Sequence, residues 1–240
     1  MPYSGLKRNL HRQVVDQLGR RIVGGHIQVG ATLPNEADLS AELGVSRTVT
    51  REAIKVLGEK GLVIARPKVG TQVQPRSKWN QLDPDVLTWE YEVGPRDGFL
   101  LTLTEVRRII EPAAAKLAAE RATEADIQAI AACYDDLEHC ADDDYSEQYI
   151  PTDIRFHSAI VRASQNELLE QIVNTIRAAL VSSRKITTQV PGGSRETLPL
   201  HYAVFDAIRR QQPAEAYQAM YALIDRAAAD IHRVLGTPGA

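Results

Sequence analysis

The stretch GVSRTVTREAIKVLGEKGLV, residues 44–63, has two chemically different sides when it is drawn as a helix. Its apolar side chains recur at helical spacing and form one face: Val49, Ala53, Val56 and Leu57. On another face Arg47, Arg51 and Lys55 lie four residues apart and form a basic stripe. Because serine is a favoured N-cap residue, the pattern predicts a helix that starts at Ser46 and ends near residue 60. A rigid rod with one apolar side and one cationic side is suited to binding a polyanion.

Two further helices are expected before this one. Residues 10–23 have helical apolar spacing, and Asn35 is a plausible N-cap for a short helix that ends at Gly44. Only Val45 separates that glycine from Ser46, where the next helix starts. Two short helices joined by a tight turn containing glycine are typical of a helix-turn-helix unit.

The segment after the basic helix predicts a β-hairpin. Residues 62–66 and 71–73 are short β-prone runs on either side of a turn that contains Pro67 and Gly70. A hairpin that follows a recognition helix is called a wing. Lys68 lies near the expected tip of this wing, where it could contact phosphate or the minor groove of DNA.

The basic stripe has the chemistry of a DNA-reading surface. A helix is about 10–12 Å across and fits the major groove of B-DNA, where residues near its start reach base edges. Arginine suits guanine O6 and N7 as well as phosphate, and a threonine methyl group can contact thymine. The side chains predicted to contact DNA from this helix are Arg47, Thr48, Thr50, Arg51 and Lys55. From charge alone, an ordinary solvated basic face is the alternative.

Charge divides the chain into two parts. Residues 1–78 contain 13 Lys/Arg and 6 Asp/Glu, whereas residues 79–240 contain 15 and 25. Such asymmetry suggests separate tasks, in which the basic part meets a polyanion such as double-stranded DNA. No apolar run approaches the roughly 18 residues that cross a bilayer, and the N-terminus has no apolar signal-peptide core. We therefore expect a soluble cytoplasmic protein without a membrane partner.

The expected organisation is mainly α, with a winged helix-turn-helix domain at residues 1–76, a linker with a short helix at 77–98, and an all-α bundle for ligand binding and dimerisation at 99–240. In the linker, Asp83 followed by Pro84 is a good N-cap and first-turn pair for the short helix. Trp79 and Trp89 are expected to pack between the two domains.

Beyond residue 99 the apolar spacing predicts helices alone. They are expected at about residues 100–121, 123–140, 151–163, 167–185, 196–210 and 214–235. Pro112 should bend the first of them, and Thr123 to Asp126 resembles a capping box with Asp in place of Glu. A bundle of this size can hold an internal cavity.

Two pairs of side chains in this bundle could carry chemistry. Asp153 and His157 lie four apart on one helix face, so they could bind a metal ion with His201 from a later helix as a third ligand. A local Asp–His hydrogen bond is the plainer alternative. Arg107 and Glu111 are also four apart. An ion pair is the default there, but a buried arginine also has the right fork for a ligand carboxylate.

A third candidate stands at the end of the helix expected at 167–185. Ser182, Ser183 and Arg184 could hydrogen-bond a polyhydroxylated ligand there. Arg107 and Arg184 are therefore candidate effector-binding side chains.

The segment LPNEADLSAELGVSRTVTREAIKVLGEKGLVIARPKVGTQV resembles the DNA-binding signature of GntR-type bacterial regulators, and the similarity extends over some 60 residues. The resemblance implies DNA contacts by Arg47, Thr48 and Arg51, and by the wing around Gly70. Many members carry Arg directly after the Glu of the LPxE segment, where this chain has Ala37. Either the operator differs, or one contact to phosphate or base has been given up.

VRRIIEPAAAKLAAERAT and DIRFHSAIVRASQNELL resemble the helical effector (FCD) domain of the FadR-type branch of that family. Many members of that branch hold a divalent metal with an Asp and a His four apart, a later His, and a last His in the final helix. Asp153, His157 and His201 match the first three, whereas Leu223 stands at the fourth position. Three protein ligands could still hold Zn, Ni or Mn if the effector or water supplies the rest. A metal-free pocket, in which Asp153 and His157 hydrogen-bond the effector directly, is also open. The resemblance implies that Asp153, His157 and His201 are effector-binding side chains in addition to Arg107 and Arg184.

WNQLDPDVLTW and EVRRIIEP are similar to repressors of galactonate catabolic operons within that branch. This similarity implies a sugar-acid effector such as galactonate, with Arg107 binding its carboxylate. The expected function is a homodimeric transcription regulator, a repressor of sugar-acid catabolism that a small carboxylate releases from operator DNA. Two alternatives are a metal-dependent enzyme that uses Asp153, His157 and His201, and a DNA-binding protein without an effector.

Overall fold

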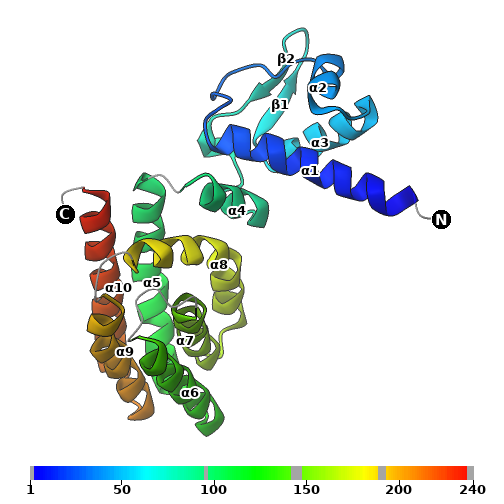
Figure 1. Ribbon diagram of the computed structural model, residues 1–240. Coiled ribbons are helices and arrows are strands. Elements are labelled where there is room, and N and C mark those ends of the chain that lie inside the picture. Colours follow the sequence, from blue (N-terminus) through cyan, green and yellow to red (C-terminus); the bar gives the residue numbers. More distant parts are fainter. Residues whose placement is uncertain (1–2, 95–96, 142–147, 189–192, 237–240) are drawn as a thin grey trace. The chain divides into compact units, whose positions relative to one another are not determined.

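A computed structural model of the chain describes residues 3–94, 97–141, 148–188 and 193–236. The chain divides into two compact units, residues 1–95 and 96–240 (Figure 1). Within the described ranges, strands occur in the first unit alone. No helix in these ranges combines the length and the apolar character that a membrane span requires.

Helices and one hairpin build the first unit: α1 (Tyr3–Val23), α2 (Glu36–Leu43), α3 (Arg47–Glu59), β1 (Val63–Arg66), β2 (Gly70–Val73), the 3-10 turn η1 (Arg76–Lys78) and α4 (Pro84–Glu92). Strands β1 and β2 pair in antiparallel fashion, with Val63 opposite Val73 and Arg66 opposite Gly70. Helix α3 packs on α1 and α2, and α4 packs on α1. This arrangement confirms the predicted winged helix-turn-helix.

Local caps fix the turn between α2 and α3. Asn35 Oδ1 accepts hydrogen bonds from the backbone N–H groups of Ala37 and Asp38, at 2.9 and 3.0 Å. Gly44 ends α2 in the left-handed conformation, with φ of 66°. Two residues later, Ser46 Oγ accepts a hydrogen bond from the N–H of Val49 at 3.4 Å and starts α3. The predicted caps are therefore present on both sides of the turn.

The core of the first unit includes both tryptophans. Its main members are Val14, Leu18, Ile22, Leu39, Ala53, Leu57, Val63, Val73, Trp79 and Trp89. The Trp89 ring lies against Gly19 of α1, where an added Cβ would come within 2.5 Å of it, and its indole N–H donates to Asp16 Oδ1 at 3.2 Å. The prediction that Trp79 and Trp89 pack between the domains is wrong, because α1 presents a glycine at the place where the ring of Trp89 fits.

The segment 77–98, expected as a linker, belongs with the first unit through residue 95. Its short helix, α4, is capped by Asp83, whose Oδ1 accepts from the N–H of Asp85 at 2.9 Å. Lys60, which follows α3, reaches Asp83 at 2.8 Å and Asp85 at 2.7 Å, and these ion pairs tie the start of α4 to the end of α3.

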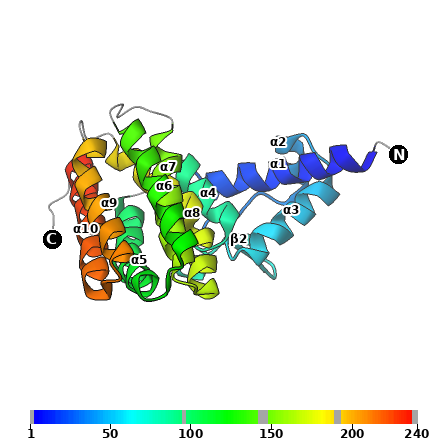
Figure 2. The same cartoon turned by 90° about the horizontal axis from the view of Figure 1, so that it is seen from below.

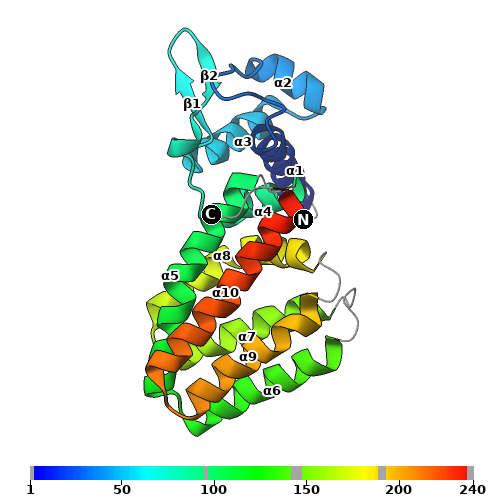
Figure 3. The same cartoon turned by 90° about the vertical axis from the view of Figure 1, so that its left-hand side faces the viewer.

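The second unit is a helical bundle (Figures 2 and 3): α5 (Asp97–Arg121), α6 (Glu124–Cys140), α7 (Tyr149–Ala163), α8 (Glu167–Thr187), α9 (Gly193–Arg209) and α10 (Pro213–Leu235). Helix α10 runs beside α5 and α9, and α7 lies between α6 and α8. The predicted all-α bundle is confirmed.

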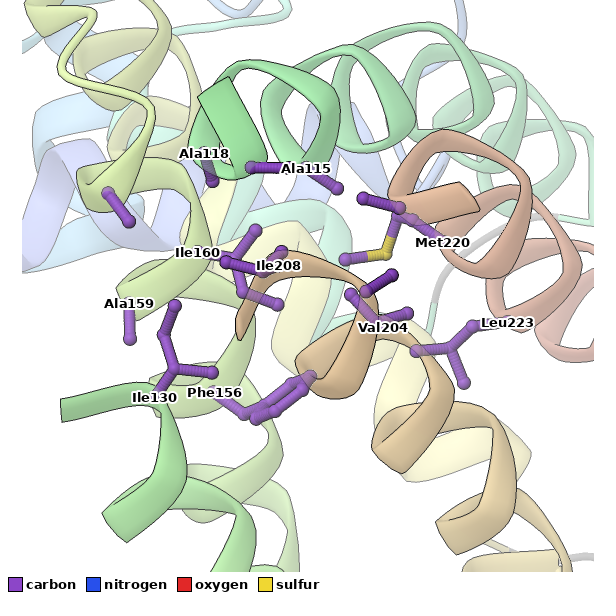
Figure 4. Close-up of a cluster of buried hydrophobic side chains, with 14 of the residues drawn as sticks. Ala115, Ala118, Ile130, Phe156, Ala159, Ile160, Val204, Ile208, Met220 and Leu223 are labelled. Carbon is purple, nitrogen blue, oxygen red and sulfur yellow. The ribbon is translucent and has the colours of Figure 1, made fainter. Parts of the chain in front are cut away.

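The core of this bundle positions the functional side chains. It draws members from five helices (Figure 4): Ala115, Ala118, Ile130, Phe156, Ala159, Ile160, Val204, Ile208, Met220 and Leu223. Phe156 is fully buried and anchors α7, so its neighbours Asp153 and His157 are carried into the interior. Leu223 packs in the same core with only 4% of its surface exposed. Its apolar side chain cannot supply the fourth metal ligand that the resemblance implies.

Candidate nucleic-acid interface and buried ionic cluster

One side of α3 is exposed and basic. The side chains of Arg47, Arg51 and Lys55 are exposed, as is that of Thr48. Ala53 and Leu57, in contrast, are fully buried against the rest of the first unit. At the tip of the wing Lys68 is exposed and has a φ of 64°, and Gly70 follows with a φ of 106°.

Thr50 is not part of this exposed side. It is fully buried, and its hydroxyl lies 2.9 Å from the hydroxyl of Ser40 on α2. A side chain that links α2 to α3 inside the unit cannot reach a duplex. Thr50 therefore has to be removed from the set predicted to contact DNA.

Inside the second unit, charged and imidazole side chains from four helices form a buried ionic cluster: Arg107, Glu111, Asp153, His157, Arg184 and His201. Each of them is at most 7% exposed. Burying charges costs free energy unless they are paired, and even then such pairs contribute little net stability. This cluster is therefore a candidate binding site.

The first half of the cluster is built around Glu111. Arg107 Nε donates to Glu111 Oε1 at 2.5 Å, which is the predicted ion pair. The other carboxylate oxygen lies 2.7 Å from His157 Nδ1. Arg107 Nη1 and Nη2 are buried without a hydrogen-bond partner in the described ranges. Arg107 thus keeps two unused donor groups, although one edge of its guanidinium is occupied.

The second half of the cluster is built around Asp153. His201 Nε2 lies 3.1 Å from Asp153 Oδ1, and His157 Nε2 lies 3.9 Å from the same oxygen. Arg184 Nε pairs with the second carboxylate oxygen. Burial raises the pKa of Asp153, but the positive charge of Arg184, together with the neighbouring His157 and His201, outweighs this effect and holds the pKa below its ordinary value. Asp153 is therefore ionised.

Asp153, His157 and His201 fit a metal ion. Their ligand atoms lie within 4.8 Å of one another. His201 Nδ1 donates to the backbone oxygen of Thr197 at 2.8 Å, and His157 Nδ1 faces Glu111, so both rings turn Nε2 toward Asp153. His157 Nε2 is buried and has no hydrogen-bond partner among the described residues, an atom that a metal would satisfy. Burial lowers the pKa of His157, which keeps the ring in its neutral, ligating form.

A small cavity adjoins this cluster. It is lined by Tyr149, Asp153, Arg184, Thr187, Thr188, Ser194, Thr197, His201, Leu223, Ala227 and Asp230. Its volume is about 30 Å³, well below the roughly 300–1,000 Å³ of small-molecule pockets. A ligand larger than a few atoms can therefore enter only if lining side chains move apart.

The structure adds cavity residues that the sequence did not indicate. Tyr149, Thr187, Thr188, Ser194 and Thr197 bring hydroxyl groups to the cavity lining from α7, from the end of α8 and from α9. Serine and threonine near helix ends commonly hydrogen-bond the local backbone, and the hydroxyl groups of these threonines do so here. Their spacing in the sequence therefore does not indicate a cavity.

The candidates at the end of α8 have different outcomes. Arg184 lies in the cavity wall, as a ligand-contacting role requires. The side chains of Ser182 and Ser183 lie outside the described part of the chain. Arg107, Glu111 and His157 belong to the cluster but do not line the cavity.

Comparison with known proteins identifies both parts of the chain. Residues 10–73 match the model for bacterial regulatory proteins of the gntR family, and residues 102–226 match that for the FCD domain. The chain is 34% identical over 215 residues to the galactonate operon transcriptional repressor of Escherichia coli (strain K12), covering 88% of this chain and 92% of that protein. It is 32% identical over 222 residues to a putative L-lactate dehydrogenase operon regulatory protein of the same organism, with 90% and 84% covered.

A solved structure shares the fold. Lar, which controls the expression of the Listeria monocytogenes agr system, superimposes with a TM-score of 0.63 at 19% identity, covering 93% of this chain and 96% of that one. A winged helix-turn-helix with an exposed basic helix, joined to a helical effector domain, defines a DNA-binding transcription regulator. The chain belongs to the GntR family of bacterial regulatory proteins and carries an FCD domain. The predicted class is confirmed, and the enzyme alternative is wrong because the matched families and relatives are regulators.

Proposed function

We propose that this protein is a homodimeric repressor of sugar-acid catabolism genes, and that a polyhydroxy carboxylate such as galactonate releases it from its operator. The observation that carries the proposal is the unused pair of donor groups on Arg107, buried in an ionic cluster whose members Asp153, Arg184 and His201 line a cavity that also carries hydroxyl groups. The similarity to the galactonate operon transcriptional repressor supports the same effector class.

The charges of the cluster favour an anionic ligand. Burial, and then the nearby positive charge of Arg107, lowers the pKa of Arg184, so two like charges are held close together. Glu111 and Asp153 balance these two arginines when His157 is neutral. A carboxylate that bridges Arg107 and Arg184 would relieve their repulsion and use the free donors.

Asp153, His157 and His201 are the proposed ligands of a divalent metal. Such an ion would supply a Lewis-acidic point for a carboxylate or hydroxyl oxygen of the effector. With the ion present, the cluster would carry excess positive charge, which again favours an acid as effector.

The hydroxyl groups of the cavity wall favour a polyol chain over a short acid such as lactate. Tyr149, Ser194 and Thr197 line the cavity, and their hydroxyl groups would exchange hydrogen bonds with ligand hydroxyls. Ser194 Oγ is buried and has no hydrogen-bond partner among the described residues, so a ligand hydroxyl would satisfy it.

Release from DNA follows from linkage. Because the cavity of about 30 Å³ must open for the effector, the bound and free forms of the bundle differ in side-chain packing. An effector that prefers a form with badly spaced DNA-binding units lowers operator affinity by the same factor as its own preference for that form.

The proposed DNA-contacting residues of each protomer are Arg47, Thr48, Arg51, Lys55, Lys68 and Gly70. Helix-turn-helix units commonly dimerise so that two recognition helices meet half-sites about one helical turn apart.

The test is release from a duplex. A binding sequence is selected from a random duplex library with the full chain, and its affinity is measured by fluorescence anisotropy with and without millimolar galactonate or lactate. Galactonate should lower the affinity about 5- to 150-fold, and lactate should have a much smaller effect. Unchanged DNA affinity at millimolar galactonate would rule out galactonate as the effector. If lactate lowers the affinity as much as galactonate does, the cavity hydroxyl groups do not select the effector.

A further inference from the structure

An ion pair crosses from α2 to the basic stripe of α3. Glu36 is the first residue of α2, and Arg51 lies in the second turn of α3. Arg51 Nε is 3.1 and 3.2 Å from the two carboxylate oxygens of Glu36, and Nη2 is 2.8 Å from one of them. Both side chains stand in solvent, with 67% and 40% of their surfaces exposed. Arg47 and Lys55, one turn to either side, have no ion pair with the described residues.

The pair leaves one edge of the arginine free. A guanidinium has five N–H donors, and Glu36 occupies the edge formed by Nε and Nη2. The edge formed by Nη1 and the second hydrogen of Nη2 has no partner in the described ranges. Recognition of guanine needs two parallel donors for O6 and N7, which this remaining edge supplies. Arg51 can therefore hold Glu36 and a guanine at the same time.

The surroundings fix the position of the carboxylate. Asn35 caps α2 directly before Glu36, so the backbone of Glu36 is part of a well-defined first turn. One turn later, the buried contact between Ser40 and Thr50 holds α2 against α3 at 2.9 Å. The hydrogen bonds from Arg51 are the leading cause that lowers the pKa of Glu36, which keeps the carboxylate charged. The two links, Glu36–Arg51 and Ser40–Thr50, span the same helix pair.

We propose that Glu36 is a positioning residue that makes Arg51 selective for guanine. Held along one edge, Arg51 presents its free edge in a fixed orientation, so a guanine meets a prepared pair of donors. The carboxylate also offsets the charge of Arg51, so this arginine adds less to the sequence-independent attraction of phosphates. Both effects raise the ratio of specific to non-specific binding. The inference rests on the proposed role of α3 in reading DNA.

An exposed ion pair with no functional role is the plain alternative, because such pairs often contribute nothing measurable. The two hypotheses predict different effects on DNA binding when the Glu36 carboxylate is removed. A passive surface charge repels every duplex equally, so its loss should raise affinity for all sequences by one factor. A positioning residue, in contrast, changes the preference at one base pair.

The experiment uses the full chain as wild type, Glu36→Gln, Arg51→Ala and the double variant. Glu59→Gln is the matched control for Glu36→Gln. Glu59 is an exposed acid on α3, the helix of Arg51, and lies two turns beyond Arg51. Sequences are selected from a random duplex library with the wild type. Affinities of all variants are then measured for the selected duplex, for duplexes with each guanine replaced, and for a random duplex.

Arg51→Ala should lower the preference for one guanine about 5- to 150-fold. Glu36→Gln should lower the preference at the same position at least about twofold, while its affinity for random duplex stays equal or rises. The double variant should match Arg51→Ala, and Glu59→Gln should keep the wild-type preference. Thermal melting checks that every variant is folded.

Three outcomes would overturn the inference. In the first, Glu36→Gln has the same base preferences as Glu59→Gln. In the second, the losses of guanine preference caused by Glu36→Gln and Arg51→Ala add up in the double variant. In the third, Arg51→Ala keeps every base preference of the wild type. If the wild type enriches no sequence from the library, the proposed role of α3 in reading DNA is itself wrong. This result can be distinguished from the three outcomes above.

Discussion

Glu111 contacts two side chains at once. Its Oε1 accepts a hydrogen bond from Arg107 Nε, four residues earlier on the same helix, and its other carboxylate oxygen lies 2.7 Å from His157 Nδ1 on α7. The carboxylate therefore orients an imidazole as well as an arginine.

We predict that Glu111→Gln weakens metal binding. The amide keeps the shape of the side chain but no longer offers a charged acceptor for His157 Nδ1, and loss of such an outer partner usually costs about 10- to 100-fold in metal affinity. Calorimetric titration of the metal-stripped protein with Zn²⁺ measures this. Glu105→Gln, an exposed acid of the same helix, is the control and should bind as the wild type. A folded Glu111→Gln variant with unchanged affinity would contradict the assignment.

Thr50 and Arg51 are adjacent residues with opposite environments. Thr50 lies three and seven residues before Ala53 and Leu57, so helical spacing puts it on their buried face. The spacing therefore contained the signal that excludes Thr50 from the DNA-contacting set. The pairing of Arg51 with Glu36 had no such signal, because it joins two helices.

At the scale of the element, the helix starts were the most predictable feature. Asn35, Ser46, Asp83 and Thr123 were predicted as caps and each caps a helix, because a cap depends on the few residues beside it. Ends without a capping residue were less well placed. Helix α1 begins at Tyr3, well before the predicted start near residue 10.

The capping box of α6 gives a prediction at this scale. Thr123 Oγ1 accepts from the N–H of Asp126 at 3.2 Å, and Asp126 Oδ2 accepts from the N–H of Thr123 at 2.9 Å. Thr123→Ala should lower the free energy of unfolding by about 0.5–2 kcal/mol. Thr102→Ala, in an exposed position within α5, should be close to neutral, because alanine is the better helix former. Urea denaturation compares the two, and equal effects would count against the cap.

The tryptophans mark the limit of prediction from local pattern. Trp89 lies on α4 with apolar neighbours that fit any buried surface, so the pattern cannot say which domain receives the ring. The answer depends on Gly19, some 70 residues away, whose missing side chain leaves space for the indole. Pairing between distant segments is the information that spacing lacks.

At the scale of the whole molecule, the charge division and the fold agree. The basic first part holds the winged helix-turn-helix, and the acidic second part holds the buried ionic cluster. Both features were predictable because each leaves a local signature, a basic stripe or an Asp–His pair. The cavity wall was not, since its residues come from α7, α8, α9 and α10 and meet only in the fold.

In the proposed function, the buried ionic cluster receives an acid and thereby governs DNA binding. Arg107→Lys tests it, since lysine keeps a positive charge beside Glu111 but loses the guanidinium fork. Arg108→Lys is the control, because Arg108 is the next residue on α5 and pairs with Asp225 instead.

The decisive measurement is the galactonate concentration that releases half of each variant from the selected duplex. Arg107→Lys should bind this duplex as the wild type does but require about 10-fold or more galactonate for release, since a hydrogen bond to a charged group is lost. Arg108→Lys should be released at the wild-type concentration. Release of Arg107→Lys at the wild-type concentration would contradict the account.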